Sequence, residues 1–212
     1  MSDRLVEVLP LPQRLALTYA PRRSHAPLLA LLALDARLAA VVRSHREPIA
    51  AQLRLAWWRD RLSQTSAPGG QGEPVLEALG AWPDPSSLLP LVDGWESLLV
   101  ETVDAGALMT CAQGRADAFA SLAQQLGEDR EAARGAGLIW SLADLAAHPP
   151  QGMQEEAVAR GRELQLPTLP AALRPLAVLA ALGAGALRRG GGPLLRGPGS
   201  LLTALRTGLI GR

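Results

Sequence analysis

The chain contains 212 residues, 48% of them hydrophobic, and its 21 basic and 20 acidic residues leave a formal charge of +1. This balance excludes the strongly basic surface that attracts DNA or RNA, so we expect no nucleic-acid partner. Leu and Ala are abundant, whereas only one Phe and one Tyr occur, which favours helices over sheet. We therefore predict a single all-α domain, a helical bundle over residues 1–212.

Proline and leucine patterns mark the helices of the first half. Pro12 can open a helix that Pro21 ends, because proline has no backbone amide and disfavours helix in the preceding residue. Leucines almost surround the next segment, which indicates a central helix packed on several sides. The expected helices are residues 12–19, 25–43, 47–64 and 75–79, with a Pro/Gly-rich loop at 65–74.

Capping residues and glycines mark the helices of the second half. Asp84 and Pro85 are typical of a helix start. Gly127 is a stop signal, and Glu128 with Asp129 suits the positive end of the next helix. The expected helices are residues 85–103, 106–126, 128–148, 151–166, 171–188 and 201–210, and glycine runs predict a flexible segment at 189–200.

Two apolar stretches, 28–42 and 176–187, are the candidates for a membrane span. Both fall short of the roughly 18 to 20 apolar residues that a span requires, so we expect buried helices and no transmembrane span. No secretory signal is visible at the N-terminus. The one cysteine, Cys111, has no partner within the chain, which fits a reducing compartment. We expect a cytoplasmic protein, with peripheral contact to the inner face of a membrane as an alternative.

Residues 28–62 carry the most specific pattern of the chain: a leucine-rich helix followed by EPIAAQLRLAWWRDRL. This pattern resembles the N-terminal signature of the squalene/phytoene synthase family, particularly the branch with mitochondrial complex I assembly factors. Ala56 replaces the usual Gln. The matching positions are Glu47, Pro48, Arg54, Leu55, Trp57, Trp58, Arg59 and Asp60. Weaker likeness continues at residues 90–99, 135–146 and 166–182, and the resemblance implies a shortened isoprenoid-synthase fold.

The resemblance also implies a metal-dependent reaction, for which the required carboxylates are missing. Family enzymes join two prenyl diphosphates head to head, and two Asp-rich motifs on facing helices hold Mg²⁺ against the diphosphate. Magnesium needs hard oxygen ligands, which carboxylates at i and i+4 provide. At the first motif the chain instead has residues 43–46, Arg-Ser-His-Arg, and at the second it has only Asp144. The sequence predicts no metal site and no catalytic residue, with Mg²⁺ as cofactor only if the chain is an enzyme.

Glu73 and Glu77 have the spacing of a carboxylate pair, but they lie beside the Pro/Gly loop. We interpret them as a solvated face. His25, His45 and His148 are far apart in sequence, and we expect none of them to have a second histidine or a carboxylate at ligand spacing, so a zinc site is not expected.

Eight residues remain candidates for binding a ligand or partner. Arg43 and Arg46 could hold a diphosphate without metal, although cations at a helix C-terminus also stabilise the helix. Trp57 and Trp58 point about 100° apart on a helix, so we expect one in the core and the other at a partner surface or prenyl-chain tunnel. The full set is Arg43, Arg46, Arg54, Trp57, Trp58, Arg59, Asp60 and Asp144.

Three functions are compatible with these observations. The leading interpretation is a degenerate, non-catalytic family member that serves as a binding or assembly scaffold, with a respiratory complex I protein or a prenyl lipid as partner. The alternative is a prenyl transferase that uses Asp144 together with carboxylates of a partner chain. A third interpretation is a peripheral membrane protein that binds through its apolar C-terminal helices.

Overall fold

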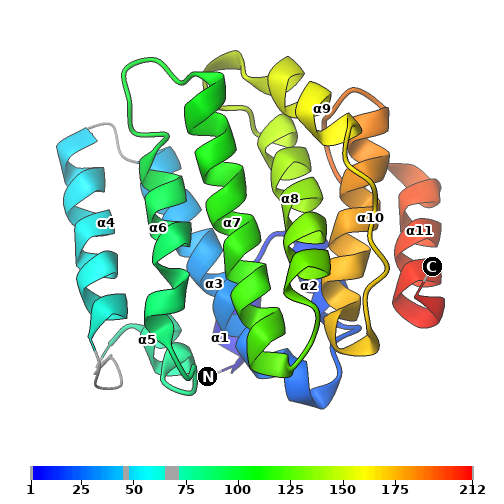
Figure 1. Cartoon of the computed structure of the whole chain (residues 1–212), viewed down its shortest axis with the longest axis horizontal. Helices are drawn as coiled ribbons and strands as arrows, with labels where there is room; N and C mark the ends of the chain where they lie inside the picture. The colour runs from blue at the N-terminus through cyan, green and yellow to red at the C-terminus, as the bar shows by residue number, and fades with distance from the viewer. Residues whose placement is uncertain (1, 45–47, 65–71, 212) are drawn as a thin grey trace.

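The computed structural model describes residues 2–44, 48–64 and 72–211 (Figure 1). In these residues the chain forms eleven α-helices and three short 3₁₀ helices, without a β-strand, so the all-α prediction is confirmed. The α-helices of the first half are α1 (Ser2–Glu7), α2 (Leu11–Leu17), α3 (Arg22–Ser44), α4 (Pro48–Ser63), α5 (Pro74–Leu79) and α6 (Leu89–Glu96). Those of the second half are α7 (Ala105–Leu126), α8 (Arg130–Ala147), α9 (Gln154–Arg162), α10 (Arg174–Arg188) and α11 (Gly197–Ile210).

The helices form a bundle around α3. In Figure 1, α4, α6, α7, α8, α10 and α11 follow one another from left to right, and α3 crosses behind α6 and α7 and packs against both. Nearly all-round leucines on α3 explain this position: Leu28, Leu31, Leu32, Leu34 and Leu38 are all buried. The arrangement agrees with the isoprenoid-synthase-like bundle that the sequence predicts.

Helices α6 and α7 approach each other closely because residue 114 is a glycine. A Cβ atom built on Gly114 of α7 would lie 2.1 Å from the carbonyl oxygen of Pro90 and 3.2 Å from the Cα of Gly94, both in α6. Only glycine at position 114 permits this contact. The approach matters because Trp95 of α6 and Arg115 of α7 both face the bundle centre.

Several helix ends lie where the sequence predicts them. Gly127 adopts the left-handed conformation (φ 71°) after α7, and the Asp129 side chain accepts hydrogen bonds from the amides of Glu131 and Ala132 at the start of α8. Asp104 caps α7 in the same way, through the amide of Ala107. These caps satisfy amides that lack partners inside the helix.

Other helix ends differ from the prediction. The helix expected over 85–103 is a 3₁₀ turn, Pro85–Leu88, followed by α6, which ends at Glu96. The Ser97 hydroxyl contacts the carbonyl oxygens of Gly94 and Ala107, and it thereby holds the chain against α7 instead of continuing the helix. The predicted 151–166 helix is shorter, α9, and the N-terminal helix α1 was not expected.

The segment expected to be flexible, 189–200, contains hydrogen-bonded and helical residues. Gly190 to Gly192 have φ near +90°, which glycine adopts without strain. The Gly191 amide bonds to Ala186, and Gln154 donates to the carbonyl oxygen of Gly190. Residues 197–200 form the first turn of α11, so the expected start of the last helix at 201 was four residues late.

By length and composition alone, two helical segments could cross a membrane: Arg22–Arg43 and Ala171–Arg188. The expectation that both stretches are too short is therefore wrong on that criterion. In the structure, 61% and 72% of their most apolar windows are buried inside the bundle. Core helices pass the same test, so these segments are weak evidence for a span.

Candidate functional site

A buried arginine with two carboxylate partners lies at the centre of the bundle. Arg115 of α7 is 1% exposed. Its Nε and Nη2 donate to the two carboxylate oxygens of Asp35 on α3, at 3.0 and 2.9 Å. Nη2 also lies 3.0 Å from Oδ2 of Asp144 on α8. A bidentate guanidinium–carboxylate pair is one of the strongest polar contacts in a protein, and it joins three helices here.

Two tryptophans enclose this ion-pair cluster of Arg115, Asp35 and Asp144. The Arg115 guanidinium lies over the Trp140 ring at 4.3 Å and over the Trp95 ring at 5.0 Å. Trp95 also donates its indole N–H to Asp35 Oδ1 at 2.9 Å. The rings exclude water and attract the cation, so the charges interact in a medium of low polarity.

Arg43 and His148 border the cluster on the side of Asp144. Arg43 Nη2 lies 3.7 Å from Asp144 Oδ2, and its guanidinium is 5.6 Å from the Trp95 ring. His148 Nδ1 lies 3.5 Å from Asp144 Oδ1. Arg43 and His148, with Trp95, also line a cavity of about 290 Å³. Two cations and a histidine therefore surround the Asp144 carboxylate.

These contacts set the charge states of the cluster. Burial on its own raises the pKa of Asp144, but the Arg115 charge outweighs it, and His148 and Arg43 add to that effect, so the pKa is well below the ordinary value. Burial likewise lowers the pKa of Arg115, and the two aspartates reverse this and raise it. The hydrogen bond with Asp144 raises the pKa of His148. Asp144 and Arg115 are therefore paired as ions.

Cys111 lies one turn before Arg115 on α7 and is buried. Burial raises the pKa of its thiol to about 12, which Arg115 only partly offsets. The thiol is therefore protonated at neutral pH and unreactive as a nucleophile. This agrees with the interpretation of a small core residue.

The eight candidate residues from the sequence lie at different places in the structure. Arg43 and Asp144 meet at the cluster, whereas Arg46 lies outside the described residues. Arg43 contacts Asp144 and Trp95, so helix-end stabilisation is not its only role. Arg59 pairs with Asp93 at 2.5 Å and also with Glu96, which fixes α4 to α6. Asp60 is exposed.

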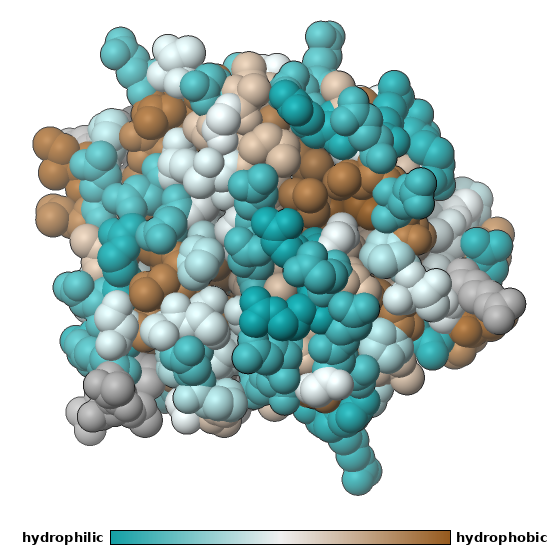
Figure 2. Space-filling view, in the orientation of Figure 1, coloured by the Kyte–Doolittle hydropathy of each residue, from teal (hydrophilic) through white to brown (hydrophobic). Residues whose placement is uncertain are grey.

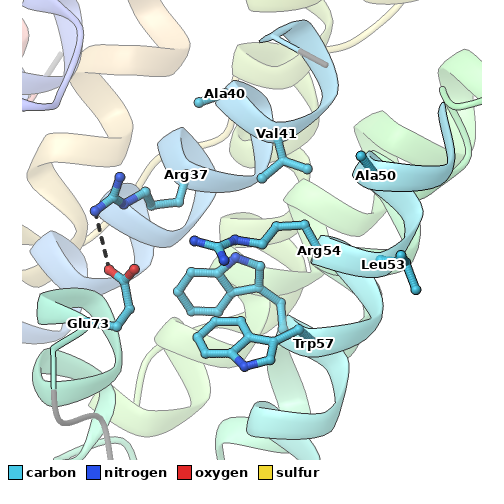
Figure 3. Close-up of a pocket in the computed structure, with 9 residues that line it drawn as sticks. Arg37, Ala40, Val41, Ala50, Leu53, Arg54, Trp57 and Glu73 are labelled. Atoms are coloured by element: carbon cyan, nitrogen blue, oxygen red, sulfur yellow. Dashed lines mark hydrogen bonds and ion pairs between the residues drawn. The ribbon is translucent and has the colours of Figure 1, made fainter. Parts of the chain in front are cut away.

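Trp57, Trp58 and Arg54 lie on α4 beside a groove between α3 and α4 (Figure 3). Trp58 is 1% exposed and Trp57 is half-buried, as the 100° spacing predicts. Arg54 lies over the Trp57 ring at 5.3 Å. The groove has a volume of about 640 Å³.

Arg37 and Glu73 form a polar wall of this groove (Figure 3). Arg37 Nη2 lies 3.4 Å from Glu73 Oε1, and Glu73 also caps α5 through the amide of Val75. Glu73 is thus an N-cap and ion-pair partner, while Glu77 is exposed. The solvated-face interpretation therefore holds for Glu77 only.

Sequence reasoning missed Asp35, Arg115 and the link between His148 and Asp144. The expectation that His148 has no carboxylate at ligand spacing is wrong, because Asp144 precedes it by four residues on one helix face. A lone acid inside a leucine-rich helix, Asp35, was the available signal for a buried charge pair. Its partner Arg115 is 80 residues away.

The fold and site define a helical-bundle protein whose central acidic side chains face arginine. Residues 14–95, which run from α2 to the Trp95 of the cluster, match the family model described as squalene/phytoene synthase. The match supports membership of that family and covers less than half of the chain; the likeness at 135–146 and 166–182 lies outside it. Neither the curated proteins nor the solved structures gave a match.

Replacing Arg115 with Met should destabilise the protein by about 3–5 kcal/mol at neutral pH, because two buried carboxylates lose their counter-charge. The loss should shrink at acid pH, since unpaired buried carboxyls bind protons readily. Urea denaturation at several pH values measures both effects. As a control, Arg134→Met breaks the half-exposed Asp117 pair and should cost less than about 1 kcal/mol. Equal losses in the two variants would contradict the account.

The His148–Asp144 contact should make stability depend on pH. Because the folded-state pKa of His148 lies above its ordinary 6.5, the contact stabilises fully below about pH 6.5 and is lost as pH rises through the folded value. The difference in unfolding free energy between wild type and His148→Gln should therefore be larger at about pH 5.5 than at about pH 8.5. In an Asp144→Asn background the pH dependence should vanish; its persistence there would exclude Asp144 as the cause.

Proposed function

We propose that this squalene/phytoene synthase-like chain is a non-catalytic binding or assembly scaffold. The observation that carries the proposal is the Arg115 cluster: both acidic side chains at the bundle centre, Asp35 and Asp144, are bonded to one buried guanidinium. A carboxylate whose charge a guanidinium already compensates is a weaker ligand for a divalent cation. The helices that the structure describes carry no acidic cluster of the kind that the family's chemistry needs.

Mg²⁺, the metal that the resemblance implies, does not fit this donor set. In the described residues, no group of three or more His, Cys, Asp or Glu side chains is close enough together to hold a metal ion. A cation placed beside Asp144 would also meet the charges of Arg115 and Arg43, which lie 3.0 and 3.7 Å from Oδ2, and like charges repel at such distances. Arginine already supplies the positive charge that a metal ion would bring to these carboxylates.

The groove between α3 and α4 is the binding surface that we assign to the scaffold. Leu53, which lines the groove, is 68% exposed. Ile49, one turn earlier on α4, is 71% exposed, and Trp57 continues this stripe at a spacing of four residues. In Figure 2, hydrophobic atoms gather at the left edge, over α4. Arg54 beside the stripe suits an acidic group on the partner.

This surface fits either an amphipathic helix of a partner protein or a prenyl chain with an acidic head group. The resemblance to complex I assembly factors favours a respiratory complex I protein or a prenyl lipid. An amphipathic helix would place its apolar side chains at the same four-residue spacing along the groove.

A thermal shift assay with a non-hydrolysable farnesyl or geranylgeranyl diphosphate analogue tests the proposal. A ligand that binds only the folded state raises the melting temperature. We expect no Mg²⁺-dependent increase and no turnover of the native diphosphates. An increase without metal that Trp57→Ala removes would identify the groove as a prenyl-lipid site and keep the scaffold proposal. A Mg²⁺-dependent increase with the analogue, together with product formed from the native diphosphates, would overturn the scaffold proposal.

The alternative, a prenyl transferase, has one structural observation in its favour. Asp144 is 14% exposed and lies beside Arg43 and His148, which line the 290 Å³ cavity. A partner chain could bring further carboxylates to this cavity.

The alternative predicts that Asp144→Ala abolishes product formation by the assembled complex while the helical circular dichroism signal is retained. A matched substitution away from the cavity, Asp117→Ala, should leave product formation unchanged. Unchanged turnover in the Asp144 variant would remove this alternative.

A further inference from the structure

Helix α11 packs with its polar side inward and its leucines outward. The buried side chains of the helix are Ser200, Ala204 and Thr207. The large apolar side chains are between 49% and 72% exposed: Leu201, Leu202, Leu205, Leu209 and Ile210. Helices on the surface of a soluble domain normally show the opposite pattern. An apolar face of this kind marks a docking surface.

The orientation of α11 is fixed by contacts on its inner side. Gly208 packs so closely on Tyr19 that a Cβ atom there would lie 2.3 Å from the ring. Arg174 of α10 donates to the carbonyl oxygen of Thr207, at 3.4 Å. Any rotation that buried the leucines would break both contacts. The helix lies at the right edge of the bundle in Figure 1, beside α10, and hydrophobic atoms are visible at this edge in Figure 2.

The charge of the chain changes sign just before this region. Residues 1–163 contain 15 Arg and 20 acidic residues, whereas residues 164–212 contain six Arg and no Asp or Glu. Four of these arginines are exposed on α10, α11 and the segment between them: Arg188, Arg189, Arg196 and Arg206. The segment that carries the apolar face of α11, 164–212, thus contains arginines and no acidic residue.

We propose that α11 docks the chain on an anionic lipid surface, with the leucine face in the acyl–headgroup boundary and the flanking arginines on lipid phosphates. A helix of 14 residues is too short to cross a bilayer, but long enough to lie in the interface. Each exposed arginine adds attraction to an anionic leaflet.

Charge decides between lipid and a second copy of the chain. A symmetric dimer through α11 would bring the same arginine-bearing surface of both copies together. Within 164–212 no acidic residue could pair with those arginines, so contacts between the two copies of this segment would join like charges. Anionic headgroups provide the complementary charge instead.

Co-sedimentation of the full chain with vesicles tests this inference, using phosphatidylcholine alone and phosphatidylcholine mixed with phosphatidylglycerol. The chain should sediment with the anionic vesicles, and added salt should weaken binding because it screens the arginines. Leu205→Ser combined with Leu209→Ser should reduce the bound fraction roughly tenfold. Both side chains are exposed, so the variant should fold, which circular dichroism verifies.

The matched control is Val100→Ser combined with Leu166→Ser, which removes two exposed aliphatic side chains elsewhere and should leave binding unchanged. Equal loss in both double variants, or no sedimentation with either vesicle, would overturn the inference. So would a wild-type dimer in analytical ultracentrifugation that the α11 variant converts to a monomer. The scaffold proposal survives each of these failures, because it concerns the α3–α4 groove and the central cluster.

Discussion

A buried guanidinium with two carboxylates is the constraint on which the rest of this structure depends. Arg115 is enclosed by Trp95 and Trp140 and compensated by Asp35 and Asp144. Removing either carboxylate would leave a buried charge less well compensated, so the pairs favour one arrangement of α3, α7 and α8. Gly114 permits the close approach of α6 that brings Trp95 to the same centre.

The same constraint determines which chemistry the bundle can support. In the family that residues 14–95 match, the resemblance implies carboxylates that hold metal ions against a diphosphate. Here the Arg115 guanidinium pairs with both central carboxylates without a ligand. Arg43 adds a second positive charge beside Asp144. An interior neutralised in this way favours a structural role for the cluster, which is why the two binding proposals concern outer surfaces, the α3–α4 groove and α11.

The sequence predicted the elements with local signals and missed those that tertiary contacts decide. Capping by Asp129 and the stop at Gly127 are local, so the ends of α7 and α8 were predicted correctly. The early end of α6 depends on Ser97 meeting Ala107 of another helix. Helical spacing alone predicts that one of Trp57 and Trp58 is buried, but not which one. Arg115 becomes a site residue only when folding brings Asp35, 80 residues away, beside it.

Counting bound Mn²⁺ by electron paramagnetic resonance is the most direct test of the central claim, because Mn²⁺ takes the same oxygen ligands as Mg²⁺. The protein is titrated with Mn²⁺ in the presence of inorganic pyrophosphate, and the signal is compared with that of a protein-free titration. If Arg115 occupies the carboxylates, the protein should bind no Mn²⁺ beyond that control. Stoichiometric binding that Asp144→Asn abolishes would contradict the account.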